Sequence, residues 1–414
     1  MARCFTLGVL LGCCCWVAGS ASAQPPPDAS GYYIPQPGPP AANGMPVPNG
    51  APSYGPQDGL YGSATYGPDG TLCPAPVFQE DTSRNPFNFS GWFVRTEYLN
   101  WNFRKPGNVL LGSNVLGVPD PRVPRPIFDN STNPPTFLGD ASVPFLDNVR
   151  LNGLNGVRGT IGIPLVFGTF EGSIFGFHKG DGVVETNALV GTSTLVNGQL
   201  GDNINLYNNG FVAGFSSMLW GFEDNIVFEG SSSNYFSLKP VAGFRFLNLT
   251  EELDQRGQFL SDPTTGLPSV TSTIKSHTMN DLFMGQIGVR FGFDSQYVSF
   301  SFTPKFGMGS NTLKDEVTTT HFRSNGDPYV ATQARQGHFA QVINIPFTGK
   351  IHLTPNLSFV GGYEFLWVNG VTRPHTSILY NDNGPLPTPP GVVVHPTYTQ
   401  MVFNGMTLGM ELRY

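Results

Sequence analysis

The fold of this chain is decided by the stretch Phe283-Met284-Gly285-Gln286-Ile287-Gly288-Val289-Arg290-Phe291-Gly292-Phe293. One face of the stretch is apolar, with Phe283, Ile287, Val289, Phe291 and Phe293, and the other face carries Gln286, Gly288, Arg290 and Gly292. A period of two with one apolar and one polar face predicts a β-strand. The length suits a tilted strand that crosses a bilayer, which needs about 9–11 residues.

The following segment repeats this alternation. Its apolar positions are Val298, Phe300, Phe302, Phe306 and Met308, and its polar or small positions are Ser299, Ser301, Thr303, Lys305 and Gly307. The alternation alone does not identify the face that meets solvent. In a soluble β-sandwich the apolar face packs inward, whereas in a membrane barrel it faces lipid.

The lengths of the connections favour the membrane barrel. We expect strands near 91–103, 149–166, 167–178, 211–228, 235–250, 280–293, 296–310, 338–352, 357–370 and 401–414. Long polar connections would then cover 104–148, 179–210, 251–279, 311–337 and 371–400, and they alternate with tight turns around Asp294-Ser295, Thr354-Pro355-Asn356 and Ser231-Ser232-Ser233. Outer-membrane barrels have short turns on the periplasmic side and long loops outside, whereas compact soluble domains rarely carry several such loops. The sequence therefore predicts an all-β, antiparallel up-and-down transmembrane barrel of about 10 strands, or 12.

The composition agrees with this prediction. Charged residues make up 12% of the 414 residues and aromatic residues 13%, and glycines number 51. A barrel that faces lipid needs few charges and many aromatic residues and glycines. The net charge of -7 argues against a nucleic-acid partner, which would require a basic stripe.

The N-terminal part of the chain differs from the rest. Residues 1–23 resemble a secretory signal peptide, with Arg3, an apolar run from Phe5 to Val17 and the cleavage pattern Ala21-Ser22-Ala23. Four of the five cysteines lie in this segment, which leaves Cys73 in the mature chain. A rival interpretation is a lipoprotein cut before Cys13. Residues 24–86 form a Pro/Gly-rich segment that we predict to be disordered, because it cannot bury enough apolar area to offset its ordering. The predicted barrel covers 87–414.

The C-terminal segment predicts a closing strand. Its alternate positions are apolar and end on an aromatic residue: Met406, Leu408, Met410, Leu412 and Tyr414. An amphipathic last strand with an aromatic end can be seated at the membrane interface. We therefore treat these five residues as a candidate signal for the barrel-assembly machinery, with outer-membrane lipid as the other expected partner.

If the apolar faces meet lipid, charged side chains on the opposite faces point into the lumen. The candidate lumen-facing residues are Arg158, Glu171, Glu223, Lys239, Arg245, Arg290, Lys305, Lys350, Glu364, Glu411 and Arg413. They form either a salt-bridged plug that holds the strand register or an ion-lined conduit. Barrels of about eight strands are filled by side chains and those of about 16 hold a water channel, so a general diffusion pore is not expected.

No residue is assigned to catalysis, to a cofactor or to a metal. His277 lies four positions from Asp281 and His178 three positions from Asp181, and either pair could form a base with its orienting carboxylate. Such pairs are common in polar loops, and no nucleophile accompanies them. The sequence lacks H-E-x-x-H, G-x-x-x-x-G-K-[ST] and G-x-S-x-G motifs. We therefore predict that the protein is not an enzyme.

Several segments resemble, in order, one known family. They are Trp92–Leu99, Gly243-Phe244-Arg245-Phe246-Leu247, Asn280-Asp281-Leu282-Phe283-Met284-Gly285-Gln286-Ile287-Gly288, and Gly362–Trp367 leading to Val371-Thr372-Arg373-Pro374. With the closing strand, they are similar to the putative beta-barrel porin family seven of planctomycete bacteria. The resemblance spans roughly 90–414 and implies an outer-membrane barrel of uncharacterised activity.

The sequence thus predicts an exported, integral outer-membrane β-barrel with a structural or surface role, with a narrow pore left open. Two alternatives come from other classes: a soluble exported β-sandwich that acts as an adhesin or binding module, and a barrel enzyme with an active site at its rim. The oligomeric state, any transported solute and any surface ligand are not predicted.

Overall fold

The structure is a computed structural model that describes residues 91–107, 109–113, 125–129, 133–147, 149–196, 199–233, 235–260, 269–383 and 388–414. The predicted signal peptide, the predicted Pro/Gly-rich segment and their boundaries lie outside these residues and stay predictions. Within the described part, no helix is long and apolar enough to span a membrane.

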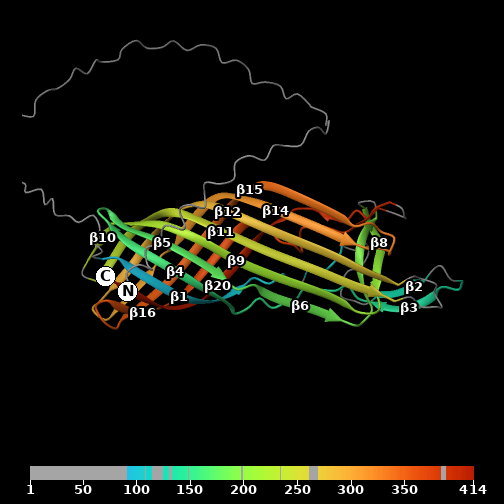
Figure 1. Cartoon of the computed structure of the whole chain (residues 1–414), viewed down its shortest axis with the longest axis horizontal. Coiled ribbons are helices and arrows are strands. Elements are labelled where there is room, and N and C mark those ends of the chain that lie inside the picture. Colours follow the sequence, from blue (N-terminus) through green and yellow to red (C-terminus); the bar gives the residue numbers. More distant parts are fainter. Residues whose placement is uncertain are drawn as a thin grey trace, which may run out of the picture. The chain divides into compact units, whose positions relative to one another are not determined.

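The described chain forms a closed antiparallel β-barrel with ten strand positions (Figure 1). These are β1 (Phe93–Phe103), β4 (Leu154–Leu165), β5 (Gly168–Phe177), β9 (Phe211–Phe228), β11 (Phe236–Phe259), β12 (Val270–Asp294), β13 (Val298–Phe302) with β14 (Lys305–Thr320), β15 (Val330–His352), β16 (Leu357–Thr372) and β20 (Tyr398–Arg413). β13 and β14 share one position because both pair with β12 and β15. The predicted all-β barrel of about ten strands is therefore confirmed.

The first and last strands close the barrel. β1 pairs with β20 from Phe93↔Arg413 to Phe103↔Phe403. Beyond the ladder, Gly91 N donates to Tyr414 O at 2.6 Å, and Tyr414 N donates to Trp92 O at 2.9 Å. The predicted closing strand is confirmed, and its partner is the first strand.

Short turns and long connections lie at opposite ends of the barrel. The connections at 166–167, 229–235, 295–297 and 353–356 are short, and β10 (Ser231–Ser232) lies within the second of them. The chain enters and leaves the barrel at this same end, which we call the turn end, as Figure 1 shows. The opposite end, the loop end, carries every long connection, so the predicted alternation of turns and loops is confirmed.

The loop end is more ordered than predicted. β11 continues to Phe259 and β12 begins at Val270, and their register runs from Phe236↔Phe293 to Phe259↔Val270 without a shift. β14 and β15 likewise extend to Thr320 and from Val330. The prediction of structureless loops at 251–279 and 311–337 was wrong, because the apolar alternation ends at the membrane boundary while the backbone ladder continues.

The remaining long connections also contain short strands. They are β2 (Arg125–Asp129), β3 (Thr136–Ala141), β6 (Gly180–Thr186), β7 (Val190–Val196), β8 (Gln199–Tyr207), β17 (Ile378–Leu379), β18 (Asn381–Asp382) and β19 (Val393–Val394). β6 continues the line of β5 along β9, and β7, β8 and β18 form a separate small sheet.

The apolar faces of the strands point out of the barrel. On β12, the side chains of Phe283, Ile287 and Phe291 are 47%, 65% and 47% exposed, whereas Gln286 is buried. This orientation contradicts the soluble β-sandwich, in which the apolar face would pack inward. The next outward residue toward the loop end is Asp281. From Phe283 to Phe293 the strand rises about 33 Å, or about 25 Å at a tilt of about 40°, which matches the apolar band of outer-membrane barrels.

Candidate functional site

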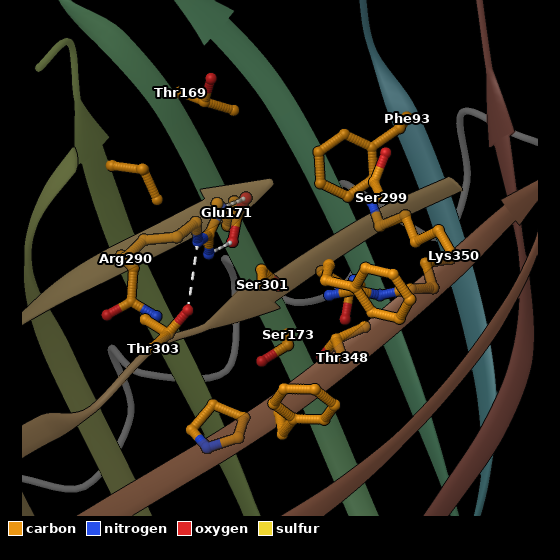
Figure 2. Close-up of a pocket in the computed structure, with 18 of the residues that line it drawn as sticks. Phe93, Thr169, Glu171, Ser173, Arg290, Ser299, Ser301, Thr303, Thr348 and Lys350 are labelled. Atoms are coloured by element: carbon orange, nitrogen blue, oxygen red, sulfur yellow. Dashed lines mark hydrogen bonds and ion pairs between the residues drawn. The ribbon is translucent and has the colours of Figure 1, made fainter. Parts of the chain in front are cut away.

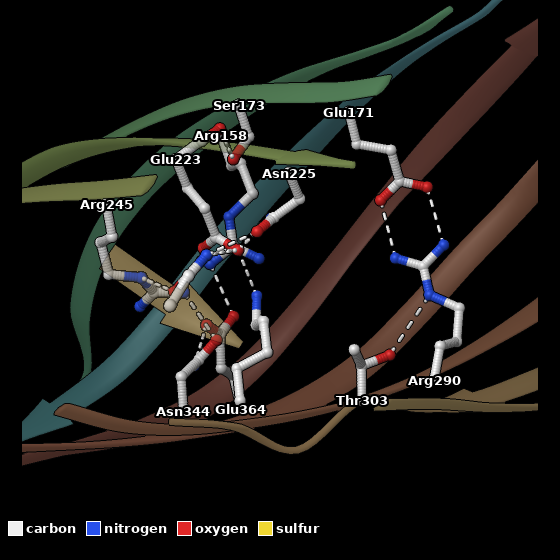
Figure 3. Close-up of polar contacts among 12 residues, drawn as sticks. Arg158, Glu171, Ser173, Glu223, Asn225, Arg245, Arg290, Thr303, Asn344 and Glu364 are labelled. Atoms are coloured by element: carbon white, nitrogen blue, oxygen red, sulfur yellow. Dashed lines mark hydrogen bonds and ion pairs between the residues drawn. The ribbon is translucent and has the colours of Figure 1, made fainter. Parts of the chain in front are cut away.

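The lumen nearest the turn end contains a polar network around Glu223 of β9 (Figure 3). Its buried carboxylate forms ion pairs with Arg245 of β11 and Lys305 of β14. It also accepts a hydrogen bond from Gln286 Nε2 at 2.9 Å and another from the Asn225 amide. Two cations and two amide donors therefore offset the cost of burying one carboxylate.

A second part of the network links β4 to β16. Arg158 Nη2 donates to Glu364 Oε2 at 2.6 Å, and Asn344 Nδ2 donates to Glu364 Oε1 at 2.7 Å. Arg245 Nη2 reaches the same Asn344 at 2.7 Å, so this part is continuous with the cluster at Glu223. The Arg158 guanidinium also lies 5.6 Å from the ring centroid of Phe175, which adds a cation–π contact.

Arg290 and Glu171 form a third pair. Arg290 Nη1 and Nη2 donate to the two carboxylate oxygens at 2.7 Å each, the paired geometry that makes an arginine–carboxylate contact strong. Figure 3 shows the two parallel contacts between β12 and β5. These strands are not neighbours in the sheet, so the pair joins two walls across the lumen.

Glu411 of β20 is the centre of a fourth cluster. Its carboxylate is fully buried, and Lys350 Nζ lies 2.8 and 2.6 Å from its two oxygens. Arg413 Nε lies 3.0 Å away and Arg95 Nη1 3.7 Å away. One carboxylate is therefore shared by three cations.

The structure brings together nearly all of the predicted lumen-facing charges. Ten of the eleven take part in ion pairs, while Lys239 lines the lumen with no ion pair among the described residues. The prediction missed Arg95 and Glu97 on β1, although their alternation with Val94 and Tyr98 was a usable signal. The candidate set also left out the amides Asn225, Gln286 and Asn344, although the alternation placed Gln286 on the polar face, because only charged residues were sought.

A layer of apolar side chains fills the lumen on the loop side of this network. The strands contribute Leu99, Trp101, Phe103, Phe175, Phe177, Phe215, Leu219, Leu249, Leu282, Met284, Val342, Leu366 and Phe403. The connection after β1 adds Leu111, Leu146, Val149 and Leu151, each of them fully buried. Ring contacts such as Trp101 to Phe177, at 4.9 Å between centroids, pack this layer closely.

The connection between β16 and β20 packs into the interior near the loop end. Arg373 forms two hydrogen bonds with Glu251, at 2.7 and 2.8 Å, and both side chains are buried. His375 lies beside the ring of Phe215, with 5.8 Å between centroids. Burial, assisted by the charge of Arg373, holds the pKa of His375 well below its usual range.

A cavity of about 580 Å³ lies within the lumen at the turn end. Its lining combines residues of the polar network with residues near the turns, among them Asp294, Ser295 and His352. Figure 2 shows Glu171, Arg290 and Lys350 at this cavity, with the hydroxyl residues Ser299, Ser301 and Thr303. The apolar layer covers the loop side of this polar space.

Neither of the two histidine–aspartate pairs considered from the sequence is formed by the described residues. Asp281 contacts Asn248 at 2.6 Å and Lys314 at 3.8 Å, and no contact joins it to His277. His178 Nδ1 lies 2.9 Å from the backbone oxygen of Lys179 and makes no contact with Asp181. His277 and Asp281 lie four apart on β12, a spacing too wide for such a pair in a β-strand.

A different histidine does lie beside a hydroxyl group. His352 Nε2 is 2.7 Å from Ser299 Oγ, and its Nδ1 is 2.9 Å from Ser358 Oγ. Ser299 and His352 are 53 positions apart, and the pairing of β13 with β15 brings them together, so no local motif signals the contact. No group of three or more potential metal ligands occurs within the described part of the chain.

Comparison with known proteins finds solved structures of low similarity. Among solved structures, the chain resembles the outer membrane protease OmpT from Escherichia coli, with 9% identity and a TM-score of 0.37 over 79% of this chain and 98% of that one. It also resembles a Pseudomonas aeruginosa FadL homologue, with 8% identity and a TM-score of 0.21 over 78% and 89% of the two chains. No curated protein matches the chain.

A family model described as Putative beta barrel porin-7 matches residues 184–414. The match begins at β6, so the predicted resemblance over 90–183 and the planctomycete origin stay predictions. The matched part includes β9 and every strand that follows it. Because this match covers more than half of the sequence, the chain belongs to the Putative beta barrel porin-7 family.

Proposed function

We propose that this protein is an integral outer-membrane barrel that is closed to solute flow and has a structural or surface role. The observation that carries the proposal is the apolar layer on the loop side of the polar network. A barrel of about ten strands lies near the size that side chains fill, far from the about 16 strands of a diffusion porin.

The proposed orientation follows the asymmetry of the barrel ends. Outer-membrane barrels keep short turns in the periplasm and long loops outside. The turn end, with both ends of the described barrel, would therefore be periplasmic, and the long hairpins and small sheets of the loop end would be presented at the surface. Export by the predicted signal peptide 1–23, insertion by the barrel-assembly machinery and contact with membrane lipid complete this proposal.

Planar-bilayer recording of the purified full-length protein tests the closed lumen. We expect no stepwise conductance, with a diffusion porin in the same bilayer as the positive control. Heat-modifiable migration of the reconstituted protein checks that the barrel is folded. Reproducible conductance steps from the folded protein would contradict the proposal and favour the narrow pore.

A second candidate function, hydrolysis, is favoured by one observation, the 2.7 Å contact between Ser299 Oγ and His352 Nε2. A nucleophile and its base within hydrogen-bond reach is the arrangement that activates serine. The group on the far side of the imidazole is the hydroxyl of Ser358, however, and not a carboxylate. Labelling with a fluorophosphonate probe decides between the two, with Ser299→Ala as the control. We expect equal background labelling, and labelling that only the variant loses would establish a reactive serine.

A further inference from the structure

The cavity at the turn end carries an excess of positive charge. Seven basic and five acidic side chains line it. Arg245 and Glu411 lie directly behind this lining and add one charge of each sign. The described residues therefore place two more cations than carboxylates around the cavity. Low-dielectric walls strengthen the field of such an excess inside a pocket.

Part of the excess is located at Glu411. Lys350, Arg95 and Arg413 all approach this one carboxylate, at 2.6, 3.7 and 3.0 Å. Arg95 Nε also lies 3.4 Å from a carboxylate oxygen of Glu97. Arg158 Nη1 lies 3.9 Å from the same oxygen, so the negative charge of Glu97 is shared between two arginines. Positive charge thus remains where β1, β15 and β20 approach the turn end.

A buried hydroxyl group without a partner lies next to this cluster. Thr160 is 95% buried, since its exposed fraction is 5%, and its Oγ1 has no hydrogen-bond partner among the described protein atoms. Thr160 lies opposite Arg95 in the β4–β1 register, and both residues line the cavity. A buried polar group left unpaired costs about 1–3 kcal/mol, so an acceptor that reached this hydroxyl would gain a hydrogen bond that the protein does not supply.

Lys239 supplies the other part of the excess positive charge. It lines the same cavity, and its cross-strand neighbour Arg290 is already paired with Glu171. No carboxylate within 4.0 Å of Lys239 is found in the described part of the chain.

We infer that this cavity binds a phosphate group, with Arg95, Thr160 and Lys350 as its principal contacts and Lys239 as a further cation. The excess of two positive charges matches a dianion. The planar guanidinium of arginine suits the oxygens of phosphate, and the threonine hydroxyl provides a further donor. The volume of about 580 Å³ admits a small phosphorylated solute as well as inorganic phosphate. The inference requires only the cavity and holds whether or not the lumen conducts.

Binding can be measured on the full-length protein in a non-ionic detergent by isothermal titration at fixed ionic strength. The probes are inorganic phosphate and glycerol phosphate, with chloride as the control anion. We expect saturable binding of phosphate and none of chloride. Thr160→Val should weaken binding about fivefold to tenfold without disturbing the fold, because it removes one hydrogen bond and keeps the shape. Arg95→Gln should abolish detectable binding.

Lys275→Gln provides the matched control variant. Lys275 is half-exposed on the loop-end extension of β12, where it pairs with Asp254, so its loss removes one positive charge far from the cavity. Phosphate affinity should stay at the wild-type value in this variant. Absence of binding of every phosphate probe to the wild type, short-chain phosphatidic acid included, would overturn the inference. So would equal affinities for wild type, Thr160→Val and Arg95→Gln.

A further titration with a short-chain phosphatidic acid identifies the source of the phosphate group. A free solute is supported if inorganic phosphate binds in the absence of lipid and competes with the lipid. If only the lipid binds, and Thr160→Val weakens that binding, the phosphate site stands and a free solute is overturned as the source of the phosphate group.

Discussion

Arg290 and Glu171 share two parallel hydrogen bonds of 2.7 Å across the lumen, although 119 positions separate them in the chain. They belong to β12 and β5, between which β9 and β11 lie in the sheet. The pair therefore acts as a strut between walls that the backbone ladder connects only indirectly.

Breaking this strut should destabilise the barrel. Glu171→Gln or Arg290→Gln leaves one charge without its partner in a largely buried setting, which should cost about 1–3 kcal/mol. The exchange Glu171→Arg with Arg290→Glu should recover part of the loss. The urea midpoint of heat-modifiable migration in micelles measures both effects. Glu252→Gln, which breaks a half-exposed pair with Lys179, serves as the control. If the variant with both substitutions to glutamine lost as much stability as the two single variants together, the residues would not interact.

The outward orientation of β13 predicts a contrast between two adjacent residues. Phe302 is 39% exposed on the lipid face, and Ser301 lines the cavity. Phe302→Arg should destabilise insertion by about 1–2 kcal/mol, because Phe302 pairs with Phe291 between the middle of the apolar band and its turn-end edge, where an arginine costs less than at the midplane. Ser301→Arg should cost clearly less. Reversible unfolding from lipid vesicles gives both values, and a reversed order would place the apolar face inside.

The closing strand should be essential for assembly. Deletion of 405–414 removes the β1–β20 pairing from Gly405↔Trp101 to the turn end. Hydrocarbon cannot satisfy the N–H and C=O groups that become unpaired, so insertion into outer-membrane fractions should be lost. Tyr414→Ser should lower the efficiency of insertion yet leave inserted molecules folded, since backbone atoms make the contacts with Gly91 and Trp92. A soluble, folded periplasmic product of the deletion would refute the barrel.

The N-terminal segment should be dispensable by the same assay. Deletion of 24–76 should leave insertion nearly unchanged, and protease should remove these residues from the intact protein before it cuts the barrel. Protection equal to that of the barrel would contradict this prediction.

Acid should weaken the loop end through His375. The pKa of this buried imidazole lies below its usual range, so the unfolded chain binds the proton more readily than the folded one. The resulting stability is fully present above about pH 6.5 and is lost as pH falls toward the lower folded pKa. Urea unfolding followed by near-ultraviolet circular dichroism at pH 7.5 and 5.0 should show the loss. His375→Gln should reduce it, and an unchanged pH dependence in this variant would exclude His375 as its cause.

The sequence allowed the faces of the strands to be predicted, but not the partners of their side chains. Alternation placed Arg290 on the polar face, yet nothing in the sequence selects Glu171 over the other inward carboxylates. Strand ends were harder to predict, because outward residues such as Lys275 and His277 break the apolar pattern while their backbone stays paired. The apolar layer was missed for another reason. Leu146 and Leu151 lie in an irregular connection without periodicity, and only the closed barrel shows where they pack.

The unbroken register of β11 with β12 limits how the length of this protein can change during evolution. A single inserted residue within either strand would move every following side chain to the opposite face, sending Arg245 toward lipid and Phe244 into the polar network. Insertions and deletions among relatives should therefore occur between Phe259 and Val270, or should change a strand by two residues at a time.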